Sequence, residues 1–299
     1  MRGRHAFGTG SYSKIMIRLA IIGPGLLGGS IALAARRSGG FHVGAWARRA
    51  EAVEELESLR IADRASSDLR EIVADAEIIV LCVPIGAMPA ISGEIAGMIV
   101  PNTLITDVGS VKGCVVSQLG PIFRHRGRFV GSHPMAGSEQ SGLKAARPDL
   151  FDGAVCMMTP DEFSDPGALE NIRDFWEKLG CKVTELSPSA HDEIVAHISH
   201  FPHLLASTLV QAVAGENPDA FNFSGPGFRD VTRIAEGPPA MWAEILHCNR
   251  NAVRKSAEAM IEKLRETVKL LDRENSMTEF LTQAQARRAR LRVHINNDV

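Results

Sequence analysis

Short apolar runs alternate with longer amphipathic segments along the first two thirds of the chain. Runs rich in branched residues predict strands, and apolar positions that recur every three to four residues predict helices. The pattern predicts strands at residues 18–22, 42–45, 77–83, 103–106, 128–130, 155–158 and 182–186. It predicts helices at residues 30–38, 51–59 and 168–179. Such alternation is typical of βαβ units, so we expect an α/β fold with a Rossmann-like, doubly wound, mostly parallel sheet.

Beyond residue 187 the strand pattern stops and only helical patterns follow. Ser187 and Pro188 supply a helix N-cap and a first-turn proline, and the helical pattern runs from there toward Gly215. Pro202 lies inside this stretch, and we expect it to kink the helix because proline lacks the amide hydrogen that a helix interior needs. A second region, all-α, therefore follows the sheet.

An apolar seam lies near the end of this helical region. Its residues follow one another at alternating spacings of four and three: Val253, Ala257, Met260, Leu264, Val268 and Leu271. A stripe with this spacing lies on one face of a helix. The seam either packs inside the chain or joins two chains, and we favour a homodimer because few other helices remain to cover it.

Composition narrows the function classes. The 299 residues include 33 Lys and Arg against 35 Asp and Glu, so no strong field attracts the protein to nucleic acid or anionic lipid. No segment approaches the roughly 20 apolar residues of a membrane span. The five cysteines are scattered without a paired CxxC spacing, which favours a reducing cytoplasm and argues against a zinc site.

The division of the chain follows from these patterns. We expect a dinucleotide-binding, Rossmann-like domain over residues 15–187 and an all-α domain over residues 188–299. Residues 1–14 are basic and contain no acidic residue or apolar core, so we expect a disordered extension rather than a targeting peptide. The alternative is a misplaced start, with Met16 as the true initiator.

A glycine-rich loop, GPGLLG at residues 23–28, follows the first predicted strand and opens a helix. In a dinucleotide site the first glycine permits a tight turn, the second lets the pyrophosphate approach the backbone, and the third lets helix pack against strand. The phosphates rest on the helix N-terminus. The residues expected to bind the cofactor here are Gly23, Gly25, Leu26, Leu27 and Gly28. The alternative is a glycine-rich turn that arose by chance.

Coenzyme choice depends on the end of the second strand. An NAD-specific site usually presents an acidic residue about 20 positions after the loop, to bind the ribose hydroxyls. Here the chain has Trp46, Ala47, Arg48 and Arg49 instead. Because two guanidinium groups suit a 2′-phosphate, we favour NADP over NAD, and the alternative is that Arg48 and Arg49 are solvated turn residues.

Polar clusters follow three of the predicted strands, where a doubly wound sheet binds its ligands. Pro84 ends one strand and is expected beside the cofactor, and residues 107–113 and 131–139 follow two others. His133 is a titratable group in a loop bounded by glycines, within reach of a nicotinamide ring. Taken alone, such a histidine is either catalytic or structural.

Seven segments together resemble one enzyme family. They are IIGPGLLGGS (21–30), DVGSVKG (107–113), GSHPMAGSEQSG (131–142), LFDGA (150–154), HISHFPH (197–203), GFRDVTRIA (227–235) and MWAEI (241–245). Their order and spacing, which extend over residues 15–271, resemble the prephenate and arogenate dehydrogenases of tyrosine biosynthesis. Long blocks of unusual composition make this likeness more specific than a dinucleotide loop alone.

The resemblance implies an oxidative decarboxylation in which a cyclohexadiene gives hydride to a nicotinamide and loses its ring carboxylate as CO₂. It implies that His133 draws off the proton of the ring hydroxyl, a general-base role that contributes roughly 10²–10⁴-fold. It further implies that Ser110 aligns His133 with the hydroxyl. The alternative for Ser110 is that it caps the helix that follows.

The resemblance also assigns substrate-binding residues to the helical region. It implies that Arg233 clamps a substrate carboxylate and that Asp230 orients Arg233, whereas a surface ion pair of these two residues is the rival interpretation. His200 and Trp242 match positions near the substrate, and core packing is their alternative. His197, His200 and His203 are spaced by three, but Pro202 and the lack of acidic or cysteine ligands nearby favour no metal.

Other functions remain open at this point. Arogenate would undergo the same chemistry as prephenate, so the sequence does not separate the two substrates. The β-hydroxyacid dehydrogenases share a Rossmann domain followed by helices, but the catalytic lysine of their second half has no matching motif here. A non-catalytic dinucleotide sensor is a further alternative, although it would not need Ser110, His133 and Arg233 together.

Overall fold

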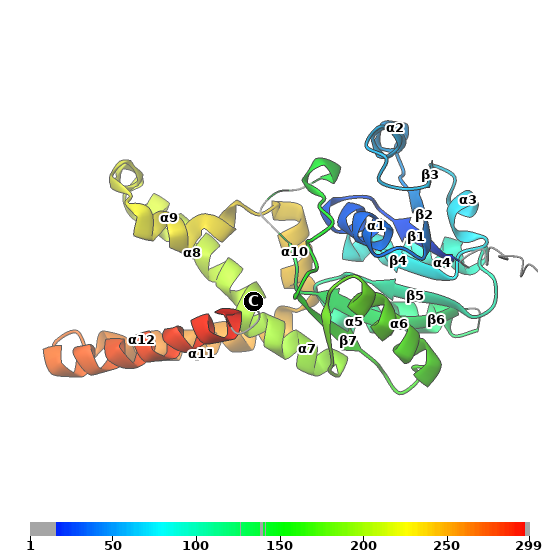
Figure 1. Cartoon of the computed structure of the whole chain (residues 1–299). Helices are drawn as coiled ribbons and strands as arrows, with labels where there is room; N and C mark the ends of the chain where they lie inside the picture. The colour runs from blue at the N-terminus through cyan, green and yellow to red at the C-terminus, as the bar shows by residue number, and fades with distance from the viewer. Residues whose placement is uncertain (1–15, 126, 138–139, 141, 297–299) are drawn as a thin grey trace, which may run out of the picture.

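The computed structural model describes residues 16–125, 127–137, 140 and 142–296. It contains a sheet region, which lies on the right of Figure 1, and a helical region that extends away from it. The extension expected at residues 1–14 lies outside the described residues.

The sheet has eight strands in the order β3-β2-β1-β4-β5-β6-β7-β8. Their bounds are β1 Ile17–Ile22, β2 Phe41–Trp46, β3 Arg64–Ser66, β4 Ile78–Leu81, β5 Thr103–Asp107, β6 Gly127–Pro134, β7 Val155–Thr159 and β8 Lys182–Glu185. All pairs are parallel except β6 with β7. The strand order reverses between β1 and β4, which is where a doubly wound sheet binds its ligand.

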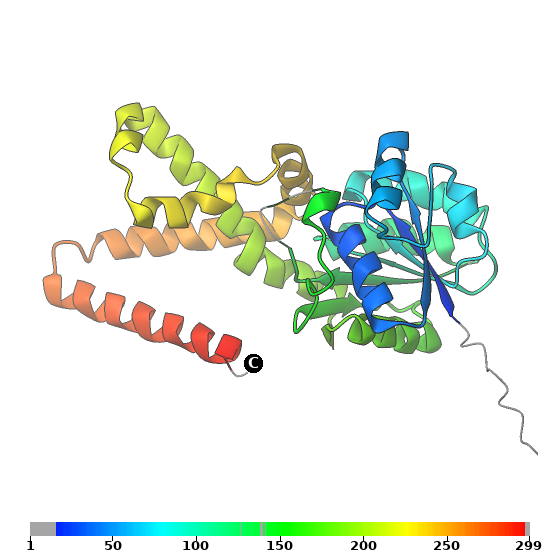
Figure 2. The same ribbon diagram turned by 45° about the horizontal axis from the view of Figure 1, so that its top comes forward.

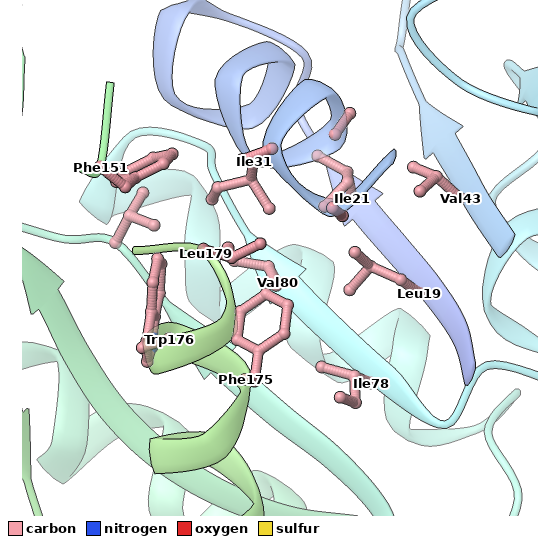
Figure 3. Close-up of a cluster of buried hydrophobic side chains, with 14 of the residues drawn as sticks. Leu19, Ile21, Ile31, Val43, Ile78, Val80, Phe151, Phe175, Trp176 and Leu179 are labelled. Carbon is pink, nitrogen blue, oxygen red and sulfur yellow. The ribbon is translucent and has the colours of Figure 1, made fainter. Parts of the chain in front are cut away.

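Helices cover both faces of the sheet. They are α1 Leu26–Ser38, α2 Ala50–Ser58, α3 Leu69–Val73, α4 Met88–Ala96, α5 Lys112–Phe123 and α6 Pro166–Lys178, with short 3₁₀ turns η1 Ile85–Ala87 and η2 Leu143–Ala145. Figure 3 shows one core, where Phe175 and Trp176 of α6 lie near Val80 of β4 and Ile31 of α1. A second core on the other face includes Ile79 and Val115. Burial of both faces explains why the strands read as continuous apolar runs.

The seven predicted strands are all present, with ends that differ by a few residues. The prediction missed β3, because its three residues Arg64–Ser66 contain no apolar run. It also began the first helix too late, since α1 starts at Leu26 and its first turns contain Gly28 and Gly29, which mask the helical pattern.

The helical region begins immediately after the sheet. Its elements are α7 Pro188–Val195, a π-helical turn η3 Ala196–His200, α8 Phe201–Glu216, η4 Pro218–Phe223, α9 Pro226–Thr232, η5 Arg233–Glu236, α10 Pro239–Cys248, α11 Arg250–Val268 and α12 Glu274–Asn296. The predicted cap of α7 is confirmed, because Ser187 Oγ accepts a hydrogen bond of 3.2 Å from Ala190 N. None of the described helices is both long and apolar enough to cross a membrane.

Pro202 lies in the first turn of α8, and the chain is helical on both sides of it. Regular α-helical bonding gives way to the π-helical turn η3 just before the proline. Such turns are frequent at functional sites, and this one presents His200.

The apolar seam is only partly covered by this chain. Val253, near the start of α11, is 5% exposed, whereas Leu264, Val268 and Leu271 are 51%, 59% and 69% exposed. Figure 2 shows α11 and α12 projecting away from the sheet region as two antiparallel helices. The intrachain core therefore accounts for the beginning of the seam and not for its end.

Candidate active site

The glycine loop has the shape that a dinucleotide pyrophosphate requires. Gly23 has φ of +98°, and a Cβ there would lie 2.8 Å from both Cys82 O and Val83 Cγ1. Gly25 is the N-cap of α1, and no heavy atom lies within 4 Å of a Cβ placed on it. The backbone at Gly25 and the first amides of α1 are therefore open to a phosphate, and a side chain at Gly25 would fill that space.

Close packing explains the third glycine of the motif. A Cβ at Gly28 would lie 3.1 Å from Ile21 Cγ2 and 3.2 Å from Cys82 Cβ, and it would overlap the carbonyl oxygen of Gly23. Helix α1 can approach β1 and β4 this closely only because residue 28 has no side chain. The three glycines thus fit the three roles that a bound dinucleotide demands.

The end of β2 lies beside this loop. Gly23 N donates a 3.1 Å hydrogen bond to Trp46 O, which joins the two segments. Arg48 and Arg49 follow directly and are both exposed, and neither forms a salt bridge with any of the residues that the structure describes. Ala47 between them and Trp46 is buried. Residues 47–50 after β2 include no carboxylate, so the two guanidinium groups are the charges nearest along the chain to the end of that strand, where a ribose would bind.

The loop after β4 is fixed by the helical region. Pro84 is the N-cap of η1, and Gly86 N in that turn donates to the carboxylate of Glu244 on α10. The segment expected beside the cofactor therefore contacts the helix that carries Trp242.

His133 lies at the end of β6, where it pairs with Met157 of β7. The prediction placed it in a loop, and this is wrong because the antiparallel pairing extends β6 to Pro134. Its side chain is buried, and its Nδ1 lies 2.8 Å from His191 Nε2. His191 Nδ1 in turn lies 2.8 Å from Asp192 Oδ1. Strand β6 and helix α7 thus contribute to one hydrogen-bonded chain, the His133–His191–Asp192 relay.

The carboxylate fixes the direction of the hydrogen bonds in this relay. An ionised carboxylate only accepts, so His191 Nδ1 carries a hydrogen. Burial lowers the pKa of His191, so the ring is neutral and its Nε2 is an acceptor. His133 Nδ1 therefore donates to His191, which leaves His133 Nε2 with a free lone pair. Burial lowers the pKa of His133 well below its ordinary value, and the neighbouring His191 and Lys112 lower it further. His133 is thus a neutral imidazole ready to accept a proton.

Asp192 is held in turn by helix α5. Its carboxylate accepts hydrogen bonds from the backbone amides of Lys112 and Gly113, at 2.7 and 2.9 Å. Burial opposes its ionisation, but the hydrogen bonds from His191 and these two amides outweigh burial and keep the pKa of Asp192 below its ordinary value. The N-terminus of α5 favours a negative charge at this position.

His200 is buried beside the relay. Its Nδ1 lies 3.0 Å from Asn249 Nδ2, and Asn249 also donates to Asp192 O at 2.8 Å. Burial lowers the pKa of His200 to about 4, so the ring is neutral. Because Asn249 donates to Nδ1, Nε2 carries the hydrogen, and it has no hydrogen-bond partner among the described residues. An unpaired buried donor of this kind is expected at a ligand site.

The ring of Trp242 packs against two histidine side chains. Its ring stacks on His203 with centroids 3.6 Å apart, and it meets the ring of His200 edge-on at 6.3 Å. Gly237 allows this packing, because a Cβ there would overlap Trp242 Nε1 and lie 3.2 Å from His203 Cε1.

The histidine triplet does not converge. His197 Nδ1 lies 3.1 Å from Ser256 Oγ, His200 contacts Asn249, and His203 stacks on Trp242. Among the residues that the structure describes, no three potential metal ligands lie close enough together to hold a metal ion.

The remaining predicted residues are Ser110, which lies between β5 and α5, and Asp230 and Arg233, which lie in the helical region. Ser110 makes no side-chain hydrogen bond within the described part of the chain, and Val111 rather than Ser110 is the N-cap of α5. The alternative that Ser110 caps α5 is therefore wrong, because Asp192 supplies the acceptor instead. Arg233 opens η5 and Asp230 lies in α9, and both side chains are exposed.

Sequence reasoning missed the partners of His133. His191 and Asp192 lie within the predicted helix, where adjacent polar residues are typical of a solvated face. Their contacts reach residues 58 and 80 positions away, so no local pattern indicates them. Asn249, in the short segment between α10 and α11, carries no local pattern either.

The fold agrees with comparisons to known proteins. The sequence profile of "Prephenate dehydrogenase, nucleotide-binding domain" matches residues 31–185, and that of "Prephenate dehydrogenase, dimerization domain" matches residues 187–284. The chain is 37% identical over 273 residues to the prephenate dehydrogenase of Bacillus subtilis, a match that covers 88% of this chain and 73% of that protein.

Two crystal structures resemble the whole molecule. Prephenate dehydrogenase from A. aeolicus, in complex with hydroxyphenyl propionate and NAD⁺, superposes with a TM-score of 0.87 at 30% identity, covering 92% of this chain and 98% of that one. Arogenate dehydrogenase from Synechocystis superposes with a TM-score of 0.79 at 30% identity, covering 91% and 99%. The chain belongs to the prephenate dehydrogenase family.

Proposed function

We propose that the protein oxidatively decarboxylates prephenate to 4-hydroxyphenylpyruvate and reduces a nicotinamide coenzyme. The observation that carries this proposal is the neutral His133, whose free Nε2 is fixed by His191 and Asp192 in a sheet that also carries an open dinucleotide loop. Membership of the family supports the same reaction.

When bound, the coenzyme accepts the hydride that leaves C4 of the cyclohexadiene. His133 Nε2 receives the proton of the C4 hydroxyl, and the bond from the ring to its carboxylate breaks with loss of CO₂. The electron pair of that bond completes the aromatic ring as a phenolate, which takes the proton back from His133 to give 4-hydroxyphenylpyruvate. Aromatisation thus drives the reaction, and the base is regenerated. The positive charge that develops on His133 is shared through His191 and stabilised by the carboxylate of Asp192.

The substrate has two carboxylates, and the proposal assigns binding groups from the helical region. Arg233 clamps one carboxylate with its planar guanidinium group, and Asp230 orients Arg233. His200 contributes its unpaired Nε2–H as a hydrogen-bond donor, and Trp242 forms an apolar wall. Ser110, at the end of the neighbouring strand β5, aligns the ring hydroxyl with His133.

The pyrophosphate would approach the first amides of α1, at Leu26 and Leu27, because Gly23, Gly25 and Gly28 have no side chains. Pro84 would border the nicotinamide side of the site. For the coenzyme itself we propose NADP in preference to NAD. Arg48 and Arg49 are exposed beside the glycine loop and can bind a 2′-phosphate. The A. aeolicus enzyme was crystallised with NAD⁺, so NAD is the alternative.

The helical region is proposed to be the substrate-binding and dimerisation domain, over residues 188–299, and residues 15–187 the dinucleotide-binding domain. The exposed end of the apolar seam supports a homodimer, as does the match to a dimerization domain. Five free cysteines support a reducing cytoplasmic location.

Arogenate is the second candidate substrate, and similarity to the Synechocystis arogenate dehydrogenase supports it. The two candidates differ only in the side chain, where an amino group replaces a keto group. The test is to supply prephenate and arogenate, each with NAD and with NADP, and to follow reduction of the nicotinamide and formation of the aromatic product. No reduction with any of the four combinations would contradict the proposed function.

A further inference from the structure

Lys112 is a fully buried lysine in the first turn of α5. Its ammonium group contacts the carboxylate of Asp107 and donates a 2.8 Å hydrogen bond to Ser132 O. Both groups lie at the ends of neighbouring strands, Asp107 on β5 and Ser132 on β6. Ser132 immediately precedes His133, so the lysine holds the backbone that carries the imidazole.

Asp107 completes this arrangement from β5. It is also fully buried, and it accepts hydrogen bonds from Gly109 N at 2.7 Å and from Ser132 N at 3.1 Å. The hydroxyl groups of Ser132 and Thr106 lie 2.7 Å apart as well. Residue 132 is therefore held through its amide, its carbonyl and its side chain, and Lys112 supplies the hydrogen bond to the carbonyl.

The main chain of Lys112 acts on the other side of His133. Its amide donates to Asp192 Oδ1, the same oxygen that accepts from His191 Nδ1. One residue thus contacts both the strand that carries His133 and the carboxylate that orients its partner ring.

We propose that Lys112 is a positioning residue for the reaction, which holds the backbone of His133 through Ser132 and supports the relay through Asp192. This inference rests on the proposed function, in which His133 accepts the substrate proton. A buried ion pair is weak support for a purely stabilising role, because apolar residues of the same volume often stabilise a fold equally well. Donating a hydrogen bond to Ser132 O while contacting the Asp107 carboxylate is a role that an apolar side chain cannot perform.

The charge of Lys112 has a second consequence for His133. The groups that face the imidazole are His191 and His200, with Asp192 behind His191, and Lys112 with its partner Asp107. The ammonium group disfavours protonation of both His133 and His191, so it helps to keep the resting base neutral. Removing this charge should therefore raise the pKa of His133.

The test compares Lys112→Met with the wild-type protein and with Lys178→Met, a change of the same type at an exposed site on α6. Methionine keeps the apolar stem and removes the charge and its hydrogen bonds. We expect kcat to fall roughly 10- to 100-fold and KM for prephenate to stay within about twofold, because a displaced base acts on the chemical step. The acid limb of the kcat profile should move to higher pH by roughly half to one unit. Lys178→Met should match the wild type.

A second variant tests the same inference if Lys112→Met alone does not fold. Asp107→Asn with Lys112→Met removes both charges at similar volume, so no uncompensated charge is left buried. Because Lys112 and not Asp107 acts on the pKa of His133, the acid limb should move in the same direction in this double variant. Histidine Cε1–H titration by NMR, assigned with His133→Asn, reports the pKa of His133 without any substrate.

The outcomes separate this inference from the proposed function. If the wild type reduces no nicotinamide with prephenate, the proposed function fails, while the NMR titration still tests the effect of Lys112 on His133. If the wild type is active but folded Lys112 variants keep both the acid limb and the titration of His133, Lys112 has only a structural role and the inference is overturned.

Discussion

His133 Nδ1 and His191 Nε2 lie 2.8 Å apart, with their rings inclined by 62°. The first residue comes from the sheet and the second from the first helix of the helical region. This contact sets the tautomer of His133 and leaves its Nε2 free to accept a proton. The proposed base is therefore complete only when both regions of the chain are in place.

The pH dependence of the reaction should reflect the burial of this pair. A general base works in its neutral form, and the lowered pKa of His133 keeps the imidazole neutral below pH 6.5, its ordinary value. We expect kcat to stay constant as the pH falls to 6.5 and to decrease only below it. Initial rates at saturating substrate across this range provide the check. An acid limb at or above pH 6.5 would mean that His133 is solvated or is not the base.

Arg233 is predicted to bind a substrate carboxylate. Replacing it with glutamine should raise KM for prephenate at least about tenfold and change kcat much less, because a charge-assisted hydrogen bond contributes about 1.5–3 kcal/mol. Arg70→Gln, at an exposed site on α3, is the matched control. An unchanged KM in Arg233→Gln would favour the alternative of a surface pair with Asp230.

The sequence predicted the fold more completely than the site. Buried parallel strands leave long apolar runs, and the glycine loop must have three small residues, so both are visible locally. The strand around His133 was not visible in the local sequence, because Ser132 and Pro134 do not form an apolar run. Pairing with β7 extends β6 there. The roles of His191 and Lys112 depend on the packing of α7 against α5 and β6, which no periodicity of the sequence encodes.

Coenzyme preference should depend on Arg48 and Arg49. We expect the wild type to prefer NADP by roughly ten- to a hundredfold in kcat/KM, since a 2′-phosphate can form one or two charge-assisted hydrogen bonds there. Arg48→Gln with Arg49→Gln should remove most of this preference and leave the value for NAD nearly unchanged. The control is again Arg70→Gln. A wild type that prefers NAD, or a ratio that the double variant does not alter, would identify both arginines as solvated turn residues.

The exposed end of the apolar seam predicts an obligate dimer. Leu264→Asp should dissociate it, because a carboxylate would be buried against apolar partners. Lys255→Asp is the control, since it lies nine residues earlier on α11 and so on the opposite face. Sedimentation velocity at nanomolar concentration distinguishes the two states. A wild-type monomer with full activity would exclude a functional role for the seam.

The most direct test of the proposed reaction measures whether loss of CO₂ accompanies hydride transfer and whether both depend on His133. Prephenate labelled in its ring carboxylate is turned over by the wild type and by His133→Asn, while labelled CO₂ and reduced nicotinamide are counted together. We predict equal amounts of both from the wild type, and from folded His133→Asn a kcat lower by about 10²–10⁴-fold at a nearly unchanged KM. Reduced nicotinamide without labelled CO₂, or full activity of His133→Asn, would contradict the mechanism.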